Sequence, residues 1–249
     1  MTTIGLLHPG EMGAAIGDAL RQSGHDVLWV SAGRSAATAQ RAAGFVDVGS
    51  LDGLVERAEV ILSVCPPHAA ADVAASVAGS DALFVDANAI SPATARAIAT
   101  GSESFVDGGI VGPPPRKEGT TRLYLSGARA AEVAALFEGT AVDARVVSDE
   151  IGDASAVKMT YAAWTKGTAA LLLAIRAVAD AEGVAEPLLE EWRLSLPDLP
   201  DAVERASRSA AAKGWRWVGE MEEIAATFAA AGQPDGFHRA AAQVYRSGA

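Results

Sequence analysis

The chain is 249 residues long, which is enough for one large domain or two smaller ones with a sizeable buried core. It carries 20 Lys and Arg residues against 31 Asp and Glu residues, so its formal net charge is −11 at pH 7. This negative charge argues against a surface that binds nucleic acid or an anionic membrane, and it favours a small soluble substrate. The single Cys65 excludes an internal disulfide and fits a reducing compartment.

Two features of the sequence predict a cytoplasmic location. The chain has no charged start followed by an apolar stretch, which is the pattern of a signal peptide. No apolar run approaches the roughly 20 residues that a transmembrane helix needs. We therefore expect a cytoplasmic protein that does not enter a membrane.

Residues 3–35 are predicted to form a strand, a helix and a second strand, which together make half of a dinucleotide-binding unit. The apolar run TIGLL stops at the turn His8-Pro9-Gly10, and helix-favouring residues fill positions 12–22. A glycine-rich turn in this position directs the N–H groups of the next helix toward one point. The helix dipole makes that point attractive to pyrophosphate.

This turn matches the dinucleotide fingerprint G-x-G-x-x-G only in part. Gly10 lets the backbone approach the phosphates and Gly13 lets the helix pack closely on the strand, but His8 stands where the first glycine belongs. An ordinary connection between a strand and a helix is the alternative for this segment alone. The residues predicted to contact a cofactor here are His8, Pro9, Gly10, Glu11, Met12 and Gly13.

The second strand ends where an Asp or Glu residue binds the ribose hydroxyls of NAD, and no carboxylate stands there. The chain instead reads SAGRS. A guanidinium beside hydroxyl groups suits the 2′-phosphate of NADP, through charge-assisted and potentially bidentate hydrogen bonds. We therefore predict NADP as the cofactor, although a solvated loop charge is the alternative for Arg34. The predicted contacts are Ser31, Gly33, Arg34 and Ser35.

Apolar strands continue to alternate with helices up to about residue 149. Strands are predicted at residues 45–46, 60–64, 83–86, from 105 onward, 123–125 and 144–147, with a helical turn near 54–55, a helix start at Ser91-Pro92 and a helix at 130–137. This pattern predicts a Rossmann domain over residues 1–149, with a doubly wound, mostly parallel sheet covered on both faces. Ligands of such sheets bind at the carboxyl ends of the strands. The residues predicted to line the cofactor cleft there are Val64, Cys65, Pro66 and Asn88.

No metal site is predicted. His8, Cys65 and His68 all lie at or just beyond strand ends, but they include no closely spaced pair in a known zinc pattern. The alternative that we prefer is that they line the cofactor cleft.

The segment VDGGIVGPPP, residues 106–115, reads as a strand that enters a stiff loop flanked by glycine. Backbone N–H groups of such a loop could bind a substrate carboxylate. A purely structural connection between two strands is the alternative.

The pattern changes at Gly152, and residues 150–249 are predicted to form an all-α domain. Residues 151–182 contain no proline and keep helical periodicity, which predicts one helix of roughly 45 Å. Proline and glycine residues divide the remainder into four predicted helices. These lie near residues 186–194, 198–212, 215–231 and 235–246.

Lys158 lies one to two turns into the long predicted helix, and Tyr161, Ala162, Thr165 and Lys166 share its face. A lysine that faces a nicotinamide cleft can protonate or polarise a carbonyl group. Most helical lysines are solvated, so the sequence pattern alone favours that alternative.

Four segments, GLLHPGEMG, VDANAISP, VDGGIVGPPP and GDASAVKMTYAAWTKG, together resemble the β-hydroxyacid dehydrogenase and 6-phosphogluconate dehydrogenase superfamily. The resemblance covers nearly the whole chain. The tail KGWRWVGEMEEIAATFAAAG resembles a branch with a shorter helical C-terminal domain that is described as phosphogluconate dehydrogenase-like. The resemblance implies an N-terminal Rossmann domain, a helical domain that builds a dimer, and an NAD(P)-dependent active site between them.

The resemblance also implies roles for single residues. Lys158 matches the catalytic lysine of the family, residues 108–113 match its loop for the substrate carboxylate, and Asn88 lies in the segment that approaches the nicotinamide. Two departures put the usual 3-hydroxyacid substrates in doubt. The family's asparagine one turn after the lysine is Ala162 here, and its loop serine corresponds to Gly112. Tyr161 or Thr165 is a candidate for the missing polar group, with a core role as the alternative.

The predicted function is an NADPH-dependent oxidoreductase that acts on a small polar, acidic carbonyl or hydroxy compound. An imine reductase and a non-catalytic NADP(H) sensor are the alternatives. The predicted catalytic residues are Lys158 and Tyr161, and the predicted substrate contacts are Gly109, Val111, Gly112, Pro113, Lys158 and Thr165. We also expect a homodimer joined through the helical domain, because its small residues and three tryptophans offer more apolar surface than about 100 residues readily bury alone.

Overall fold

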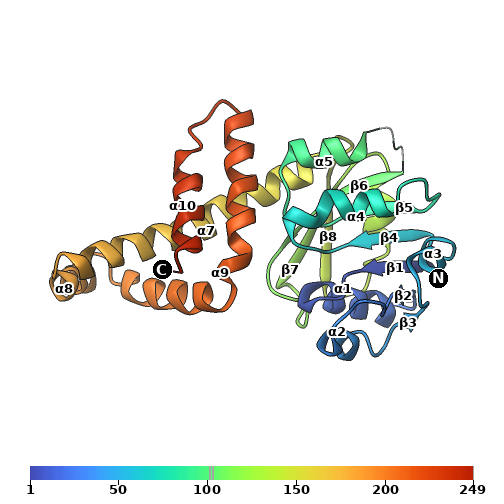
Figure 1. Ribbon diagram of the computed structural model, residues 1–249, viewed down its shortest axis with the longest axis horizontal. Helices are drawn as coiled ribbons and strands as arrows, with labels where there is room; N and C mark the ends of the chain where they lie inside the picture. Colours follow the sequence, from blue (N-terminus) through green and yellow to red (C-terminus); the bar gives the residue numbers. More distant parts are fainter. Residues whose placement is uncertain (101, 103, 249) are drawn as a thin grey trace. The chain divides into compact units, whose positions relative to one another are not determined.

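The computed structural model describes residues 1–100, 102 and 104–248 (Figure 1). The chain divides into two compact units, Met1–Lys158 and Met159–Ala249. The first unit is α/β and the second contains only helices, which confirms the predicted fold class. The change of domain was expected after residue 149. Helix α7 (Asp153–Ala181) begins just beyond that point, and its residues up to Lys158 belong to the first unit.

The first unit is built on one eight-stranded sheet with the order β3-β2-β1-β4-β5-β6-β7-β8. Strands β1 to β6 are all parallel, whereas β7 is antiparallel to β6 and β8 is parallel to β7. The order 3-2-1-4-5-6 is that of a dinucleotide-binding fold, with its switch point between β1 and β4. The strands are β1 (Thr3–Leu7), β2 (Asp26–Trp29), β3 (Val46–Asp47), β4 (Val60–Ser63), β5 (Leu83–Asp86), β6 (Phe105–Val111), β7 (Thr121–Ser126) and β8 (Val142–Ser148).

Helices cover both faces of this sheet (Figure 1). Successive strand residues point to opposite faces, and the central strands are apolar at nearly every position, so both faces bury side chains. Helices α1 (Glu11–Gln22) and α6 (Ala130–Ala135) pack in the core on one face. Helices α3 (Leu51–Val55) and α4 (Ala70–Ser76) pack on the other face, and α4 also packs with α5 (Pro92–Ala99).

Several local predictions are confirmed closely. The strand predicted at 83–86 is β5, and the predicted helix start at Ser91 is the N-cap of α5, where the Ser91 hydroxyl accepts a hydrogen bond from the Thr94 N–H at 3.2 Å. The long helix predicted over 151–182 is α7. The short α2 (Ala36–Arg41) and the 3₁₀ turn η1 (Pro67–Ala69) complete the first unit.

The second unit contains the rest of α7 together with α8 (Ala185–Ser195), α9 (Leu199–Ala230) and α10 (Gly236–Arg246). The predicted break between residues 212 and 215 is wrong, because α9 runs through Gly214 without interruption. Gly214 is buried, and a Cβ atom there would lie 3.7 Å from the Tyr245 ring of α10. The close packing of α9 on α10 offsets the cost of about 1 kcal/mol that a glycine adds inside a helix.

Helix α7 corrects one further expectation. We expected no apolar segment of membrane-spanning length, but α7 is long and apolar enough to cross a membrane by length and composition alone. Within this chain, 33% of its most apolar 18-residue stretch is buried. Alanine and leucine residues interrupted only by isolated charges raise the mean hydropathy of that stretch. The core helix of a water-soluble protein has the same character, so this property is weak evidence for a membrane.

Candidate functional site

The turn after β1 has the geometry of a phosphate-binding turn. His8 has a φ of +65°, Gly10 caps α1, and the Gly10 N–H donates to the His8 carbonyl oxygen at 2.7 Å. A Cβ atom on Gly13 would lie 2.7 Å from that same oxygen, so this position requires glycine. The structure therefore brings the predicted residues from His8 to Gly13 together at the carboxyl end of β1, where the first N–H groups of α1 lack partners within the helix.

A cavity of about 520 Å³ lies beside this turn, at the carboxyl ends of β1 and β2. His8 and Arg34, which come from different loops, both line it, and Arg34 and Asp72 are the charged residues in its lining. Its size and mainly apolar walls with a few polar groups are typical of small-molecule sites. The lining residues are Leu6, Leu7, His8, Val30, Ala32, Arg34, Gly49, Ser50, Leu51, Ala69, Asp72, Val73 and Ser76.

The loop after β2 contacts a carboxylate that the sequence analysis missed. Asp47, at the end of β3, accepts hydrogen bonds from the N–H groups of Ser31 at 3.2 Å and Gly49 at 3.0 Å. Hydrogen bonds from the Ser31 side chain and from these backbone groups lower the pKa of Asp47. An ionised carboxylate therefore lies next to Ser31. No local sequence signal marks Asp47, because its position depends on the parallel register that pairs Trp29 of β2 with Asp47 of β3.

A second missed residue, Arg41, connects α2 to the phosphate turn. Its Nε donates to the Pro9 carbonyl oxygen at 3.3 Å and its guanidinium also donates to the Thr38 hydroxyl at 3.1 Å. Thr38 in turn lies 3.1 Å from the Ser35 hydroxyl, which caps α2. These contacts join the turn after β1 to the loop after β2.

Asn88 joins the ends of β4 and β5. It is 2% exposed, its amide oxygen accepts from the Cys65 N–H at 2.5 Å, and its amide nitrogen donates to Ser63 at 3.1 Å and Asp86 at 2.9 Å. These bonds give Asn88 a role in holding the Cys65 loop. Burial raises the pKa of Cys65 to about 11 and that of Asp86 to about 7. Contacts of Val64, Cys65, Pro66 and Asn88 with a cofactor stay a prediction.

Asp107 of β6 anchors the start of α7. Its carboxylate is fully buried, and one oxygen accepts from the N–H groups of Gly152 at 3.1 Å and Ser155 at 2.9 Å and from the Ser126 hydroxyl at 3.0 Å. The other oxygen accepts from the Ser155 hydroxyl at 2.6 Å. A carboxylate that satisfies the first N–H groups of a helix also interacts favourably with the helix dipole.

Lys158 lies over β6 because the strand has a glycine beneath it. A Cβ atom on Gly109 would lie 2.8 Å from the Lys158 Cβ and 2.7 Å from the Ala154 carbonyl oxygen. From Asp107 to Gly109 the strand runs toward its carboxyl end, and the helix runs in the same sense from Gly152 to Lys158. Since β1, β4, β5 and β6 are parallel, Lys158 lies toward the edge that also carries the phosphate turn and the Cys65 loop.

The predicted substrate-loop residues divide into two groups. Gly109 and Val111 are buried in β6, where they pair with β7, whereas Gly112 and Pro113 begin the hairpin loop between these antiparallel strands. A Cβ on Gly112, whose φ is +119°, would clash with the Thr120 carbonyl oxygen. The segment therefore does connect two strands, and its contact with a substrate stays a prediction.

Tyr161 and Thr165 lie on the part of α7 that belongs to the second unit. Both are exposed, and the Thr165 hydroxyl donates to the Tyr161 carbonyl oxygen at 3.4 Å. Ala162 is 1% exposed, so it packs within the protein. The roles of Tyr161 and Thr165 toward a substrate stay predictions.

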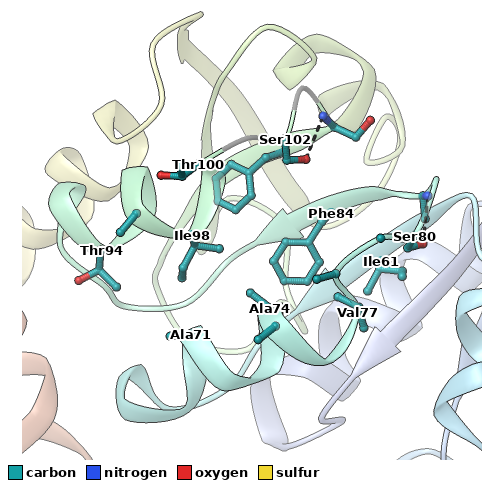
Figure 2. A pocket seen from close by; sticks show the side chains of 17 residues that line it. Ile61, Ala71, Ala74, Val77, Ser80, Phe84, Thr94, Ile98, Thr100 and Ser102 are labelled. Carbon is teal, nitrogen blue, oxygen red and sulfur yellow. Dashed lines mark hydrogen bonds between the residues drawn. The ribbon is translucent and has the colours of Figure 1, made fainter.

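Another cavity, of about 480 Å³, lies between α4 and α5 (Figure 2). Its floor contains Phe84 and Phe105, whose ring centroids are 6.0 Å apart, and its walls include Ala74 and Ile98. Both phenylalanines lie near the amino ends of their strands, opposite to the carboxyl edge described above. None of the sequence-predicted site residues, all of which the structure describes, lines this cavity. We attribute it to small alanine side chains on the two helices.

Family comparisons agree with this two-part architecture. A family model described as NADP oxidoreductase coenzyme F420-dependent matches residues 3–90, and a domain of unknown function, DUF1932, matches residues 179–248. An uncharacterised 28.5 kDa protein of Methanothermus fervidus is 33% identical over 140 residues, which are 55% of this chain and 54% of that protein. The chain therefore aligns with about half the length of this curated relative.

Solved structures match over the whole chain. A conserved hypothetical protein of Sinorhizobium meliloti 1021 is 31% identical, with 99% of this chain and 88% of that chain covered and a TM-score of 0.71. A 3-hydroxyisobutyrate dehydrogenase of Mycobacterium tuberculosis has the same TM-score at 18% identity, covering 99% and 93%. A reductive aminase of Aspergillus terreus, in complex with NADPH, has a TM-score of 0.63 at 17% identity, covering 99% and 93%. At these two lower identities the likeness shows the fold alone.

The anchoring of α7 can be tested by substituting Asp107. Asp107→Ala leaves the buried N–H groups of Gly152 and Ser155 without their acceptor, so we expect the free energy of unfolding to fall by about 3 kcal/mol or more. Ser155→Ala removes one hydroxyl donor and should cost about 1 kcal/mol. Urea unfolding measures both values. If both variants lose the same small amount of unfolding free energy, Asp107 does not anchor the helix.

Proposed function

Because the chain belongs to the β-hydroxyacid dehydrogenase and 6-phosphogluconate dehydrogenase-like superfamily, in the branch with a short helical C-terminal domain, we propose that it is an NADP(H)-dependent oxidoreductase. Its proposed substrate is a small polar, acidic carbonyl compound or the corresponding alcohol. The observation that carries the proposal is the cavity beside the phosphate turn, which contains both His8 and Arg34.

The residues of the first unit fit a phosphorylated dinucleotide. Gly10 leaves open space for phosphate oxygens, and Gly13 lets α1 pack closely against the turn. The apolar walls of the cavity suit an adenine ring, and the Arg34 guanidinium would supply a positive charge to a 2′-phosphate. When bound, the nicotinamide supplies or accepts the hydride. The chain's part is to bind and orient both reactants and to move a proton.

We assign the proton transfer to Lys158. Its Cβ packs over Gly109 of β6, in the part of α7 that runs toward the carboxyl edge of the sheet. There its ammonium group would donate a proton to the substrate oxygen as the carbonyl is reduced and would take the proton back in the reverse direction. Tyr161 and Thr165 follow on the same helix and are the proposed further contacts with the substrate.

Reduction of a C=N bond is the second candidate. The buried Ala162 stands where the family has an asparagine, which removes a polar group used on hydroxyacids. The first test is NADPH oxidation with keto acids, aldehydes and cyclic imines. Turnover of carbonyl compounds supports the first proposal, and turnover of imines alone would replace it with the second. Binding of NADPH without turnover of any compound would favour a sensor.

Cofactor preference can be tested at Arg34 and Asp47. Arg34→Ala should weaken NADPH binding by about 10- to 100-fold, because charge-assisted hydrogen bonds to phosphate are lost, and should leave NADH binding nearly unchanged. Asp47→Asn keeps an acceptor for the Ser31 and Gly49 N–H groups but removes a negative charge, so it should tighten NADPH binding several-fold. Fluorescence titration measures both cofactors. Equal losses for NADPH and NADH in Arg34→Ala contradict the assignment.

Lys158→Ala should lower turnover by about 10²- to 10⁴-fold with little change in NADPH affinity, because general acid catalysis is lost while the cofactor site is intact. Lys213→Ala, on the exposed surface of α9, is the matched control. Lys166 is unsuitable as a control, since it forms a largely buried ion pair with Glu220. Steady-state kinetics measure the turnover of each variant. A Lys158→Ala variant that keeps most of the native turnover would exclude this lysine as the general acid.

We also propose a homodimer joined through the helical unit. Trp164, Leu171, Ile175 and Val178 are between 36% and 73% exposed, and their spacing of seven, four and three residues forms one apolar stripe along α7. A stripe with this repeat is typical of a helix that packs against another helix. The second copy of the chain is the proposed partner.

Light scattering at micromolar concentration should therefore find a dimer. The double substitution Leu171→Glu and Val178→Glu places charges on the stripe and should produce a monomer. Leu194→Glu, at the still more exposed Leu194 of α8, is the control and should stay dimeric. A monomeric native protein, or a dimer that survives the double substitution, contradicts the proposed interface.

A further inference from the structure

We infer that His8 and Arg34 together bind a phosphate group of the cofactor, and that His8 takes up a proton when this phosphate binds. The inference rests on the proposed NADP(H)-dependent function and adds a proton-linked control of cofactor affinity to it. Three observations at His8 support it: its backbone conformation, its place in the cavity and the surroundings of its imidazole.

The backbone at His8 favours a residue other than histidine. Its φ of +65° lies in the left-handed region, and among the described residues it is the one non-glycine residue with a positive φ. Glycine adopts this conformation without strain, and the dinucleotide fingerprint has glycine at this position. Residues held in such conformations concentrate at functional sites, so the imidazole at this point is a candidate for a role in binding.

His8 shares the cavity with the cationic Arg34. His8, from the end of β1, and Arg34, from the loop after β2, both line it. Asp72 of α4 is the other charged residue in that lining. Arg41 contacts the same turn through the Pro9 carbonyl oxygen, and Glu11 begins α1 beyond it. A phosphate between His8 and Arg34 would lie between two nitrogen donors.

Without an anion, the surroundings keep the imidazole of His8 neutral. Burial lowers the pKa of His8, and the charge of Arg34 lowers it further. The Nδ1 atom of His8 is buried and has no hydrogen-bond partner among the described residues, so no acceptor holds a proton there. An anionic phosphate would offset the Arg34 charge and accept a hydrogen bond from the imidazolium, which raises the pKa of His8.

The sign of the pH effect follows from these pKa changes. The complex binds more protons than the free protein at pH values between the lower pKa of free His8 and the higher pKa of bound His8. Affinity for the cofactor therefore rises as the pH falls through the bound value and levels off below the free value. The proton comes from the solvent and returns to it when the cofactor leaves.

Calorimetric titration of the full chain with NADP⁺ and NAD⁺ tests this inference. At pH 7.0, where the 2′-phosphate is already largely dianionic, binding should take up a fraction of one proton, measured in buffers of different ionisation enthalpy. His8→Asn and His8→Gly both tolerate a positive φ, and they should abolish this uptake. The ratio of native to variant affinity for NADP⁺ should rise by about three- to tenfold as the pH falls from 7.5 to 6.0.

The two cofactors identify the phosphate. Proton uptake with NADP⁺ but not with NAD⁺ shows that His8 contacts the 2′-phosphate. Equal proton uptake with both cofactors shows that it contacts the pyrophosphate. Histidine NMR of the native protein provides a second measurement, because one imidazole resonance should shift its titration to higher pH when NADP⁺ is added.

Two results would overturn the inference. If both variants bind NADP⁺ with the pH dependence of the native protein, or no histidine titration moves, His8 has no such role and the proposed function stands. If the native protein binds neither NADP⁺ nor NADPH, the proposed function itself fails, and the inference fails with it.

Discussion

The carboxylate of Asp107 connects the sheet to the helix that carries the candidate proton donor. It accepts four hydrogen bonds from the start of α7 and from β7, and it is buried completely. A buried charge is tolerated only when its hydrogen-bonding capacity is used, which is the case here. The direct packing of Ala154 and Lys158 on Gly109 then sets the height of the helix above β6. The location of Lys158 depends on both contacts.

The alternation of strands and helices along the chain could be predicted because most strands are short apolar runs bounded by turn residues. The carboxyl ends of parallel strands meet at one edge, so the sequence also indicated which loops lie near each other. Asp107 could not be identified in this way. Its partners lie 19 to 48 positions away in the chain, and a carboxylate inside an apolar strand has no local signal for what it caps.

Two other differences between the prediction and the structure also arise from contacts between distant segments. Asp47 belongs to a two-residue strand, and its approach to Ser31 depends on the register of β3 beside β2. Gly214 was expected to end a helix, because the intrinsic preference of glycine is the only information available locally. Its burial against Tyr245 of α10 determines the outcome instead. Local propensity is a weak guide wherever packing between elements opposes it.

Cys65 gives the protein a useful chemical property. Burial raises the pKa of its thiol to about 11, so the reactive thiolate is a very small fraction at pH 7. Asn88 binds the backbone at the same residue, which keeps this sulfur in its partly buried position. Since Cys65 is the one cysteine in the chain, a second cysteine engineered on an exposed helix would react with a maleimide label far faster. Each half of the protein can therefore carry a single fluorescent or spin label without removal of the native thiol.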